Sequence, residues 1–273
     1  MSKVRISFLG GGNMASALIG GLIDRGADAS AIQVVDLLPE SCARLAERFG
    51  VRAVTAIDEA FVDCDLLVLS VKPQQMREAI APLSGKLSGQ LVVSIAAGLR
   101  LDDLARWLGG YRRLVRCMPN TPALIGAGVS GLYADPSVDA HGRDAAESIM
   151  KAVGSVVWVE REPLIDAVTA VSGSGPAYVF HFIEALEAGG RSLGFDEATA
   201  RRLAIDTMLG SARLAAASDE PPGVLRERVT SKGGTTEAAL ASMAQSGVFE
   251  AIVRAIAAAE ARGRELGDAL GRD

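Results

Sequence analysis

The sequence predicts an α/β protein, with a Rossmann-like, doubly wound and mainly parallel sheet followed by an all-helical C-terminal domain. Up to Arg161, short apolar segments alternate with helical segments, a pattern typical of parallel strands joined by crossovers on both faces. A glycine-rich turn joins the first apolar segment to the first helical one. Beyond that point strands give way to helical segments rich in Ala, Leu and Glu. We therefore expect two domains, residues 1–161 and 162–273.

The first predicted strand, Val4–Leu9, leads through the glycine-rich turn into a helix over Asn13–Arg25. Gly10, Gly12 and Ala15 match the G-x-G-x-x-A form of the dinucleotide-binding fingerprint. The first glycine permits the tight turn, the second lets a pyrophosphate approach the backbone, and the alanine lets the helix pack on the strand. Free N–H groups at the helix start would face the anion. A glycine turn without a ligand is the alternative.

The second predicted strand, Ile32–Val35, ends at Asp36. An acid at this place can accept hydrogen bonds from the adenosine ribose hydroxyls, whereas the 2′-phosphate of NADPH would meet a carboxylate of like charge. Residues 37–39 offer no Arg or Ser to a phosphate, and Arg44 lies within the next helix. These residues favour NADH.

The rest of the front domain repeats the strand–helix pattern. Leu66–Val71 is a continuous apolar run, as expected for a central parallel strand covered on both faces. Ligands of such sheets bind beyond the carboxyl ends of the strands, which directs attention to residues 70–73, 95–98 and 118–122. The further predicted strands are Val51–Val54, Leu91–Ile95, Leu114–Cys117, Gly128–Tyr133 and Val156–Val159, and the helices are Pro39–Phe49, Ile57–Val62, Gln74–Pro82, Leu101–Leu108 and Asp139–Val153.

Composition excludes several classes of protein. The chain has 273 residues, of which 49% are hydrophobic, and a net charge of −5, which argues against a general affinity for nucleic acid or anionic membranes. No apolar run is long enough for a spanning helix, and the N-terminal residues do not resemble a signal peptide, so we expect a cytoplasmic protein.

The three cysteines, Cys42, Cys64 and Cys117, match no metal or redox spacing. We interpret His141 as a surface residue and His181 as a core or interface residue.

The helical half is expected to form a homodimer. Its alanine-rich helices need a partner to bury both faces, and an ordinary monomeric bundle is the alternative. Asp196 is a good N-cap for its helix. The predicted helices are Ile165–Ser172, Ala177–Leu193, Glu197–Ser218, Val224–Val229, Thr236–Gln245 and Phe249–Leu270.

Two motifs in this half carry polar groups. VSGSGPAY, Val171–Tyr178, combines flexible backbone with two hydroxyls and a forced break, so it could also serve only as a hinge between helices. RVTSKGGTTEAAL, Arg228–Leu240, places hydroxyls around two glycines just before a helix, which forms an anion cradle suited to a carboxylate. Simple N-capping by Thr235 or Thr236 would explain the same residues, and capping and binding can coexist.

Six segments, taken together, resemble the motifs of pyrroline-5-carboxylate reductases in order and spacing from residue 8 to residue 240: FLGGGNMASALIGGL, VLSVKP, VVSIAAG, RCMPNTPA, AVSGSGPAY and TSKGGTTEAAL. The resemblance implies reduction of 1-pyrroline-5-carboxylate to L-proline by NADPH or NADH, the last step of proline biosynthesis. It also implies a helical dimerisation domain and a homodimer or higher homo-oligomer, often a decamer. Many members use NADPH well, so we expect both cofactors, with NADH relatively better than in members that lack Asp36.

The resemblance also implies the site residues. Thr236 is the expected catalytic residue, with a hydrogen bond to the nitrogen or carboxylate of the substrate. The substrate-binding residues are Ser231, Thr235, Thr236 and, less directly, Asp219. The cofactor-binding residues are Leu9, Gly10, Gly11, Gly12, Asn13, Met14, Val71, Lys72, Pro73, Ala97 and Asn120, together with Asp36 from its place after the second strand. No metal site is expected.

The chain departs from the family pattern at two positions. Lys232 stands where the family usually has proline, and Ile57 where an asparagine often contacts the cofactor ribose.

A protonated cyclic imine is already electrophilic, so alignment matters more than a strong acid. A β-hydroxyacid dehydrogenase is an alternative, but it should carry a lysine base that SGSGPAY lacks. A nucleotide sensor without turnover is another, against which the GGTTEAAL cradle argues.

Overall fold

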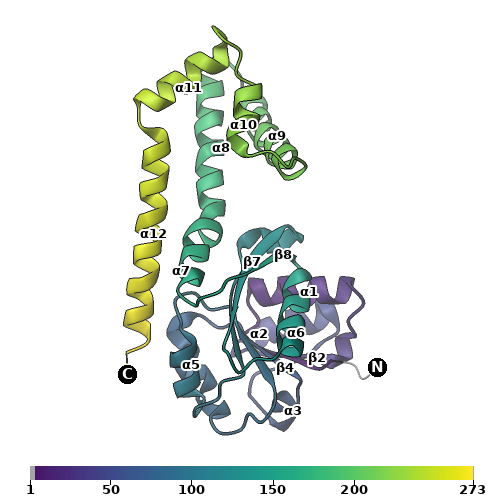
Figure 1. The fold of residues 1–273 in the computed structure, drawn as a ribbon. Helices are drawn as coiled ribbons and strands as arrows, with labels where there is room; N and C mark the ends of the chain where they lie inside the picture. Colours follow the sequence, from purple (N-terminus) through teal and green to yellow (C-terminus); the bar gives the residue numbers. More distant parts are fainter. Residues whose placement is uncertain (1–3, 273) are drawn as a thin grey trace. The chain divides into compact units, whose positions relative to one another are not determined.

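The computed structural model describes residues 4–272, which form two compact units (Figure 1). The first unit contains the chain up to Ser174 and its end from Ala259 onward. The second contains Gly175–Ala258. The division of the chain at residues 161 and 162 stays a prediction.

The first unit is built on an eight-stranded sheet in the order β3-β2-β1-β4-β5-β6-β7-β8. Every neighbouring pair is parallel except β6 with β7. The predicted Rossmann-like, mainly parallel sheet is therefore confirmed. The strand order reverses between β1 and β4, and ligands of such sheets bind at this switch point. The strands are β1 Ile6–Leu9, β2 Ile32–Val35, β3 Arg52–Val54, β4 Leu66–Leu69, β5 Leu91–Ser94, β6 Leu114–Met118, β7 Gly128–Ala134 and β8 Gly154–Trp158.

Helices cover both faces of this sheet. The two buried clusters lie on opposite faces, since neighbouring residues of one strand, such as Phe8 and Leu9, belong to different clusters. α1, α2 and α6 contribute to the first cluster, and α3, α4 and α5 to the second. Burial on both faces explains the continuous apolar runs of the strands. The helices are α1 Asn13–Asp24, α2 Pro39–Phe49, α3 Glu59–Val62, α4 Met76–Ile80, α5 Leu101–Trp107, α6 Ala140–Lys151 and α7 Leu164–Val168.

Two predicted helices are shorter than expected. Residues 74–82 do not form one helix, because α4 is flanked by 3₁₀ turns at Pro73–Gln75 and Ala81–Leu83. Each turn contains a proline, which has no N–H to continue an α-helix. α3 starts at Glu59 rather than Ile57, because the side chain of Asp58 caps it by accepting a hydrogen bond from Phe61 N.

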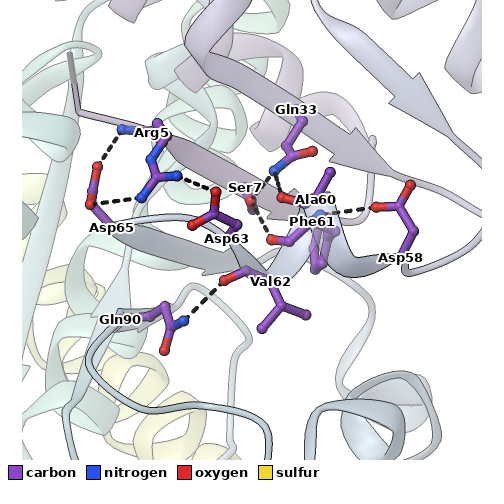
Figure 2. A network of polar contacts seen from close by, with 10 residues as sticks. All are labelled: Arg5, Ser7, Gln33, Asp58, Ala60, Phe61, Val62, Asp63, Asp65 and Gln90. Atoms are coloured by element: carbon purple, nitrogen blue, oxygen red, sulfur yellow. Dashed lines mark hydrogen bonds and ion pairs between the residues drawn. The ribbon is translucent and has the colours of Figure 1, made fainter.

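A polar network holds the amino-terminal edge of the sheet (Figure 2). Gln33 Nε2 on β2 donates to Ser7 Oγ on β1 at 3.0 Å, and Ser7 Oγ donates to the Phe61 carbonyl at 2.8 Å. Gln90 Nε2 donates to the Val62 carbonyl at 2.9 Å. These bonds fix α3 against the strands. They lie at the edge opposite the glycine turn, so we assign them a structural role.

The second unit is helical, and strands are absent from the described residues after β8. Asp196 caps its helix as predicted, by accepting a hydrogen bond from Thr199 N at 2.9 Å. Of the side chains described in this unit, only Ala200 and Ala204 are buried. The helices are α8 Gly175–Ser192, α9 Glu197–Ala216, α10 Pro222–Arg228, α11 Thr235–Gln245 and α12 Val248–Leu270, whose last turns belong to the first unit.

The predicted break in VSGSGPAY is absent. α7 continues into a π-helical turn, Thr169–Gly173, and Ser174 keeps helical backbone angles before α8 begins. Ser174 N donates to the Thr169 carbonyl at 2.8 Å, and this bond spans five residues, as in a π-helix. Pro176 falls in the first turn of α8, where its missing N–H is tolerated. The two compact units divide at this point.

Candidate active site

The predicted cofactor loops meet at one edge of the sheet. Gly10, Asp36, Val71, Ala97 and Asn120 follow β1, β2, β4, β5 and β6, whose carboxyl ends lie side by side. This brings together residues that are far apart in the sequence. The edge includes the switch point between β1 and β4, where an open α/β sheet binds its ligand.

The glycine turn has little room on one side and an open space on the other. Gly10 has a φ of +102°, and a Cβ there would lie 2.8 Å from the Ser70 carbonyl carbon, so only glycine fits. The Ser70 hydroxyl lies 2.8 Å from the Gly10 carbonyl. A Cβ on Gly12 would meet nothing within 4 Å, which leaves space for a ligand against the backbone.

The start of α1 fits the pyrophosphate of a dinucleotide. Its N-cap, Gly12, supplies no side-chain cap, and the first turn holds no acidic residue. The N–H groups of the first helical turn have no partner within the helix and carry the positive end of its dipole. Asn13 is exposed and Met14 is half-buried. Leu9 is buried, and its carbonyl accepts from Ser70 N at 2.8 Å, so Leu9 supports the turn.

Asp36 joins the glycine turn to the loop after β2. Its Oδ2 accepts from Gly11 N at 2.7 Å, and its Oδ1 accepts from Leu38 N at 2.9 Å. The carboxylate thereby occupies two backbone donors that a phosphate could otherwise use. The bond to Leu38 is a local turn that the sequence could have indicated. The bond to Gly11 depends on the pairing of β1 with β2.

The loops after β4 and β5 present different groups. Lys72 is exposed, with no ion pair among the described residues, and Pro73 starts the 3₁₀ turn that follows it. Val71 is half-buried and Ala97 is exposed. Lys72 is therefore a cation beside the switch point that pairs with none of the described acids and is available to an anionic ligand.

The side chain of Asn120 is committed to the protein. It is only 8% exposed. Its Nδ2 donates to the Ser172 carbonyl at 3.1 Å, and its Oδ1 accepts from Val129 N at 2.9 Å. Asn120 thus connects the loop after β6 with the π-helical turn and with β7. We assign its side chain a bracing role, which the resemblance did not suggest.

A buried charge cluster joins β6 to the start of α7 and to the start of α5. Arg116 on β6 is 1% exposed, and its Nη2 lies 2.5 Å from Asp166 Oδ1 of α7. Glu162 Oε1 lies 3.3 Å from Arg116 Nη1 and accepts from Leu101 N at 2.7 Å. Sequence reasoning missed this cluster. An arginine inside an apolar strand segment was the available signal, since a buried charge needs partners.

The candidate substrate cradle lies in the second unit. Gly234 N donates to the Ser231 carbonyl at 3.0 Å and Gly233 has a φ of +73°. Because no described non-glycine residue has a positive φ, this is a type II turn with Lys232 at its second position. Gly233 N donates to Glu237 Oε2 at 2.6 Å. The turn therefore has a defined shape without the usual proline.

The hydroxyls of the cradle are free to bind a ligand. The N-cap of α11 is Gly234, with no side-chain cap, so neither Thr235 nor Thr236 caps the helix as the alternative required. Their hydroxyls and that of Ser231 make no hydrogen bond to the residues that the structure describes, whereas the Thr230 hydroxyl donates to the Arg226 carbonyl at 2.7 Å.

Asp219 lies in the exposed loop between α9 and α10. The neighbouring Glu220 pairs with Arg228 at 2.5 Å, which ties this loop to the end of α10, just before the cradle. The carboxylate of Asp219 makes no hydrogen bond to the described residues. Its predicted contact with the substrate stays a prediction.

An apolar groove of about 620 Å³ lies between helices of the second unit. Its lining includes Phe182, Leu240, Met243, Phe249 and Ile252. His181 is also exposed on this unit, so it is no core residue of the single chain. Large exposed apolar surfaces mark interaction sites.

Two structural features are absent from the described part of the chain. Between residues 4 and 272, no cluster of three or more His, Cys, Asp or Glu side chains could hold a metal ion. None of the described helices is long and apolar enough to cross a membrane.

The chain is similar over its whole length to proteins of one family. The family described as pyrroline-5-carboxylate reductase dimerisation matches residues 162–266, and that of the coenzyme F420-dependent NADP oxidoreductases matches residues 5–98. A pyrroline-5-carboxylate reductase of Pseudomonas aeruginosa is 48% identical, with 100% of both chains covered.

Solved structures of reductases in this family have the same fold as this chain. A pyrroline-5-carboxylate reductase from Coxiella burnetii superposes with a TM-score of 0.92 at 39% identity, over 97% of this chain and 99% of that one. A pyrroline carboxylate reductase of Plasmodium falciparum, with NADP bound, gives a TM-score of 0.86 at 27% identity, over 98% and 99% of the two chains. The chain belongs to the pyrroline-5-carboxylate reductase family.

Proposed function

We propose that this chain reduces 1-pyrroline-5-carboxylate to L-proline with NADPH or NADH, as the last step of proline biosynthesis. The observation that carries the proposal is the cradle at the start of α11. Ser231, Thr235 and Thr236 offer hydroxyls that make no hydrogen bond to the described residues, beside the N-terminal end of a helix. Such an arrangement suits the carboxylate of the substrate.

A reduced nicotinamide supplies the hydride when it is bound. The backbone at Gly12, Asn13 and Met14 binds the pyrophosphate, and Asp36 accepts from the ribose hydroxyls. The Ser231 and Thr235 hydroxyls hold the substrate carboxylate. The Thr236 hydroxyl hydrogen-bonds the ring nitrogen or the carboxylate and so orients the imine carbon. A protonated imine is a strong electrophile, so this site needs alignment rather than a strong acid.

The decisive assay measures oxidation of NAD(P)H in the presence of 1-pyrroline-5-carboxylate. In a second arm it measures the reverse reaction, in which a 3-hydroxyacid is oxidised and NAD(P)⁺ is reduced. Turnover with the pyrroline alone supports the proposal. Oxidation of 3-hydroxyacids alone would support the β-hydroxyacid dehydrogenase reading, and binding without turnover would support a sensor.

Variants of α11 test the role of Thr236. Thr236→Ala should lower kcat/KM by roughly tenfold to a hundredfold, as expected for the loss of a hydrogen bond to a charged group, and Thr236→Ser should largely restore it. Ser242→Ala, a hydroxyl deletion further along the same helix, is the control and should leave kcat/KM unchanged. Wild-type kinetics in Thr236→Ala would remove the assignment.

We further propose that residues 1–161 bind the cofactor and residues 162–273 form the dimerisation and substrate domain. The match of residues 162–266 to a dimerisation family supports a homo-oligomer. The apolar groove and the scarcity of buried side chains in the second unit favour a homodimer, and a decamer of five dimers would follow the family pattern. A cytoplasmic location stays a prediction.

A further inference from the structure

The end of α12 packs against the loop that follows β5. A Cβ on Gly267 would lie 2.9 Å from the Gly98 carbonyl oxygen, so the two backbones meet without a side chain between them. A Cβ on Gly98, which has a φ of +78°, would lie 3.6 Å from Leu270 Cδ1. Leu270 also packs on the second buried cluster of the sheet.

Polar contacts flank this backbone contact on both sides. Arg100 Nη2 pairs with Asp268 Oδ1 at 2.5 Å, and Arg106 Nη2 donates to the Gly271 carbonyl at 2.7 Å. Glu162, just before α7, accepts a hydrogen bond from Leu101 N at 2.7 Å. The segment from Gly98 to Leu101 is thus fixed by residues that lie far from it in the sequence.

We propose that the end of α12 is a positioning element for cofactor binding, which holds the loop after β5 in its binding conformation. Ala97 is exposed at the carboxyl edge of the sheet, directly before Gly98. A loop that is ordered in advance binds with less loss of conformational entropy. The inference depends on the proposed function at one point only, the expectation that Ala97 contacts a bound dinucleotide.

Two glycines of α12 provide a matched pair of variants. A Cβ on Gly263 would lie 4.0 Å from Asp166 Cβ, an ordinary contact, whereas a Cβ on Gly267 would press on the Gly98 backbone. Gly263→Ala and Gly267→Ala gain the same helix propensity. A Cβ on Gly267 would also lie 3.4 Å from Arg100 Nη2, so a difference between the two variants reports the contacts of α12 with Gly98 and Arg100.

The experiment measures the Kd of NADH and NADPH on the full chain without substrate, and amide hydrogen exchange of residues 95–100 without cofactor. Gly267→Ala should raise both Kd values by about threefold to tenfold and speed up exchange in this segment. Gly263→Ala should change neither. A Kd within about twofold of the wild type in folded Gly267→Ala, or an equal rise in both variants, overturns the inference.

Asp268→Ala covers the case in which Gly267→Ala does not fold, because the Asp268 side chain is 57% exposed and its loss should be tolerated. Exchange in residues 95–100 should again become faster, and unchanged exchange contradicts the inference. Binding is measured without turnover. A chain that binds NAD(P)H but reduces no pyrroline would therefore refute the proposed function and leave this inference standing.

Discussion

At the scale of single residues, Asp36 bears on the choice of cofactor in two ways. Its carboxylate is a charge beside the ribose site, and it occupies the N–H groups of Gly11 and Leu38. A 2′-phosphate would be repelled by the charge and would find both donors engaged. The contact of Asp36 with the ribose remains a prediction.

Asp36→Ser should shift the kcat/KM ratio toward NADPH by about tenfold, the order expected when one repulsion of about 1.4 kcal/mol is removed. Steady-state kinetics with each cofactor measures the ratio. Glu40→Ser is the control, because it removes a nearby exposed carboxylate from the first turn of α2 without touching the glycine turn. An unchanged ratio in Asp36→Ser would show that Asp36 does not contact the ribose.

The cysteines support a different residue-scale prediction. Cys42, Cys64 and Cys117 are all buried, and burial raises the pKa of the Cys64 and Cys117 thiols. Because the thiolate is the reactive form, we expect a thiol reagent to label these residues at near-neutral pH only after unfolding. Fast labelling of Cys117 in the native protein would contradict its burial in the first hydrophobic cluster.

At the scale of elements, the turn Ser231–Gly234 keeps its shape without the proline usual in the family. The Ser231–Gly234 hydrogen bond and the positive φ of Gly233 define a type II turn, which favours proline at its second position. Lys232 occupies that position at the cost of greater freedom in the unfolded chain.

Lys232→Pro should therefore raise the free energy of unfolding by about 0.4–1 kcal/mol. Urea unfolding at one protein concentration measures the change. Lys232→Ala removes the same charge without the ring and should have a smaller effect. A destabilised Lys232→Pro variant would mean that the backbone at this position differs from a type II turn.

The cap of α3 makes stability depend on pH. The Arg52 guanidinium and the Phe61 N–H hold the pKa of Asp58 below its usual value. A group whose pKa is lowered by folding stabilises the protein above its unfolded pKa, and this contribution is lost as pH falls through the folded value.

Asp58→Ala should cost about 1 kcal/mol near neutral pH, as expected for a lost N-cap, and less at about pH 3, below the usual Asp pKa of about 3.9, where the contribution of the lowered pKa is already partly lost. Unfolding midpoints at the two pH values measure this difference. Asp58→Asn keeps a capping oxygen without the charge, so the difference in stability between Asp58→Asn and Asp58→Ala should be about the same at both pH values. A constant effect of Asp58→Ala across this range would argue against the lowered pKa.

At the scale of the whole molecule, the helical unit has few buried side chains and a wide apolar groove. Phe249 lines the groove and is 71% exposed in the single chain. Covering such a surface is the main favourable term in association. The dimerisation family that matches residues 162–266 agrees with this assignment.

Phe249→Asp should weaken the dimer by roughly 2 kcal/mol or more, as for an aromatic anchor at the centre of an interface, and lower activity with it. Light scattering at several concentrations measures the dissociation. Val157→Asp, which changes an exposed apolar residue of β8 in the first unit, should leave the assembly intact. An active wild-type monomer at assay concentration would defeat the prediction.

The sequence by itself determined the succession of strands and helices along the chain, the glycine turn, the family and the hydroxyl cradle. The elements, the turn and the cradle each depend on residues close together in the chain, whose spacing shows the period of a strand or a helix or the demands of a turn, and the family follows from several such local motifs in a fixed order. The expected break at VSGSGPAY was wrong for a related reason. Gly and Pro indicate a local preference, which a π-helical turn and a first-turn proline satisfy without a break.

The tertiary structure alone decided the contacts that support the site. Gly11 bonds a carboxylate 25 residues away, Arg116 pairs with an acid 50 residues away, and Arg100 with one 168 residues away. No periodicity relates such partners. They meet because the sheet aligns the carboxyl ends of strands that are distant in the chain, and because α12 returns to the first unit. Burial then requires charges such as Arg116 to find a partner there.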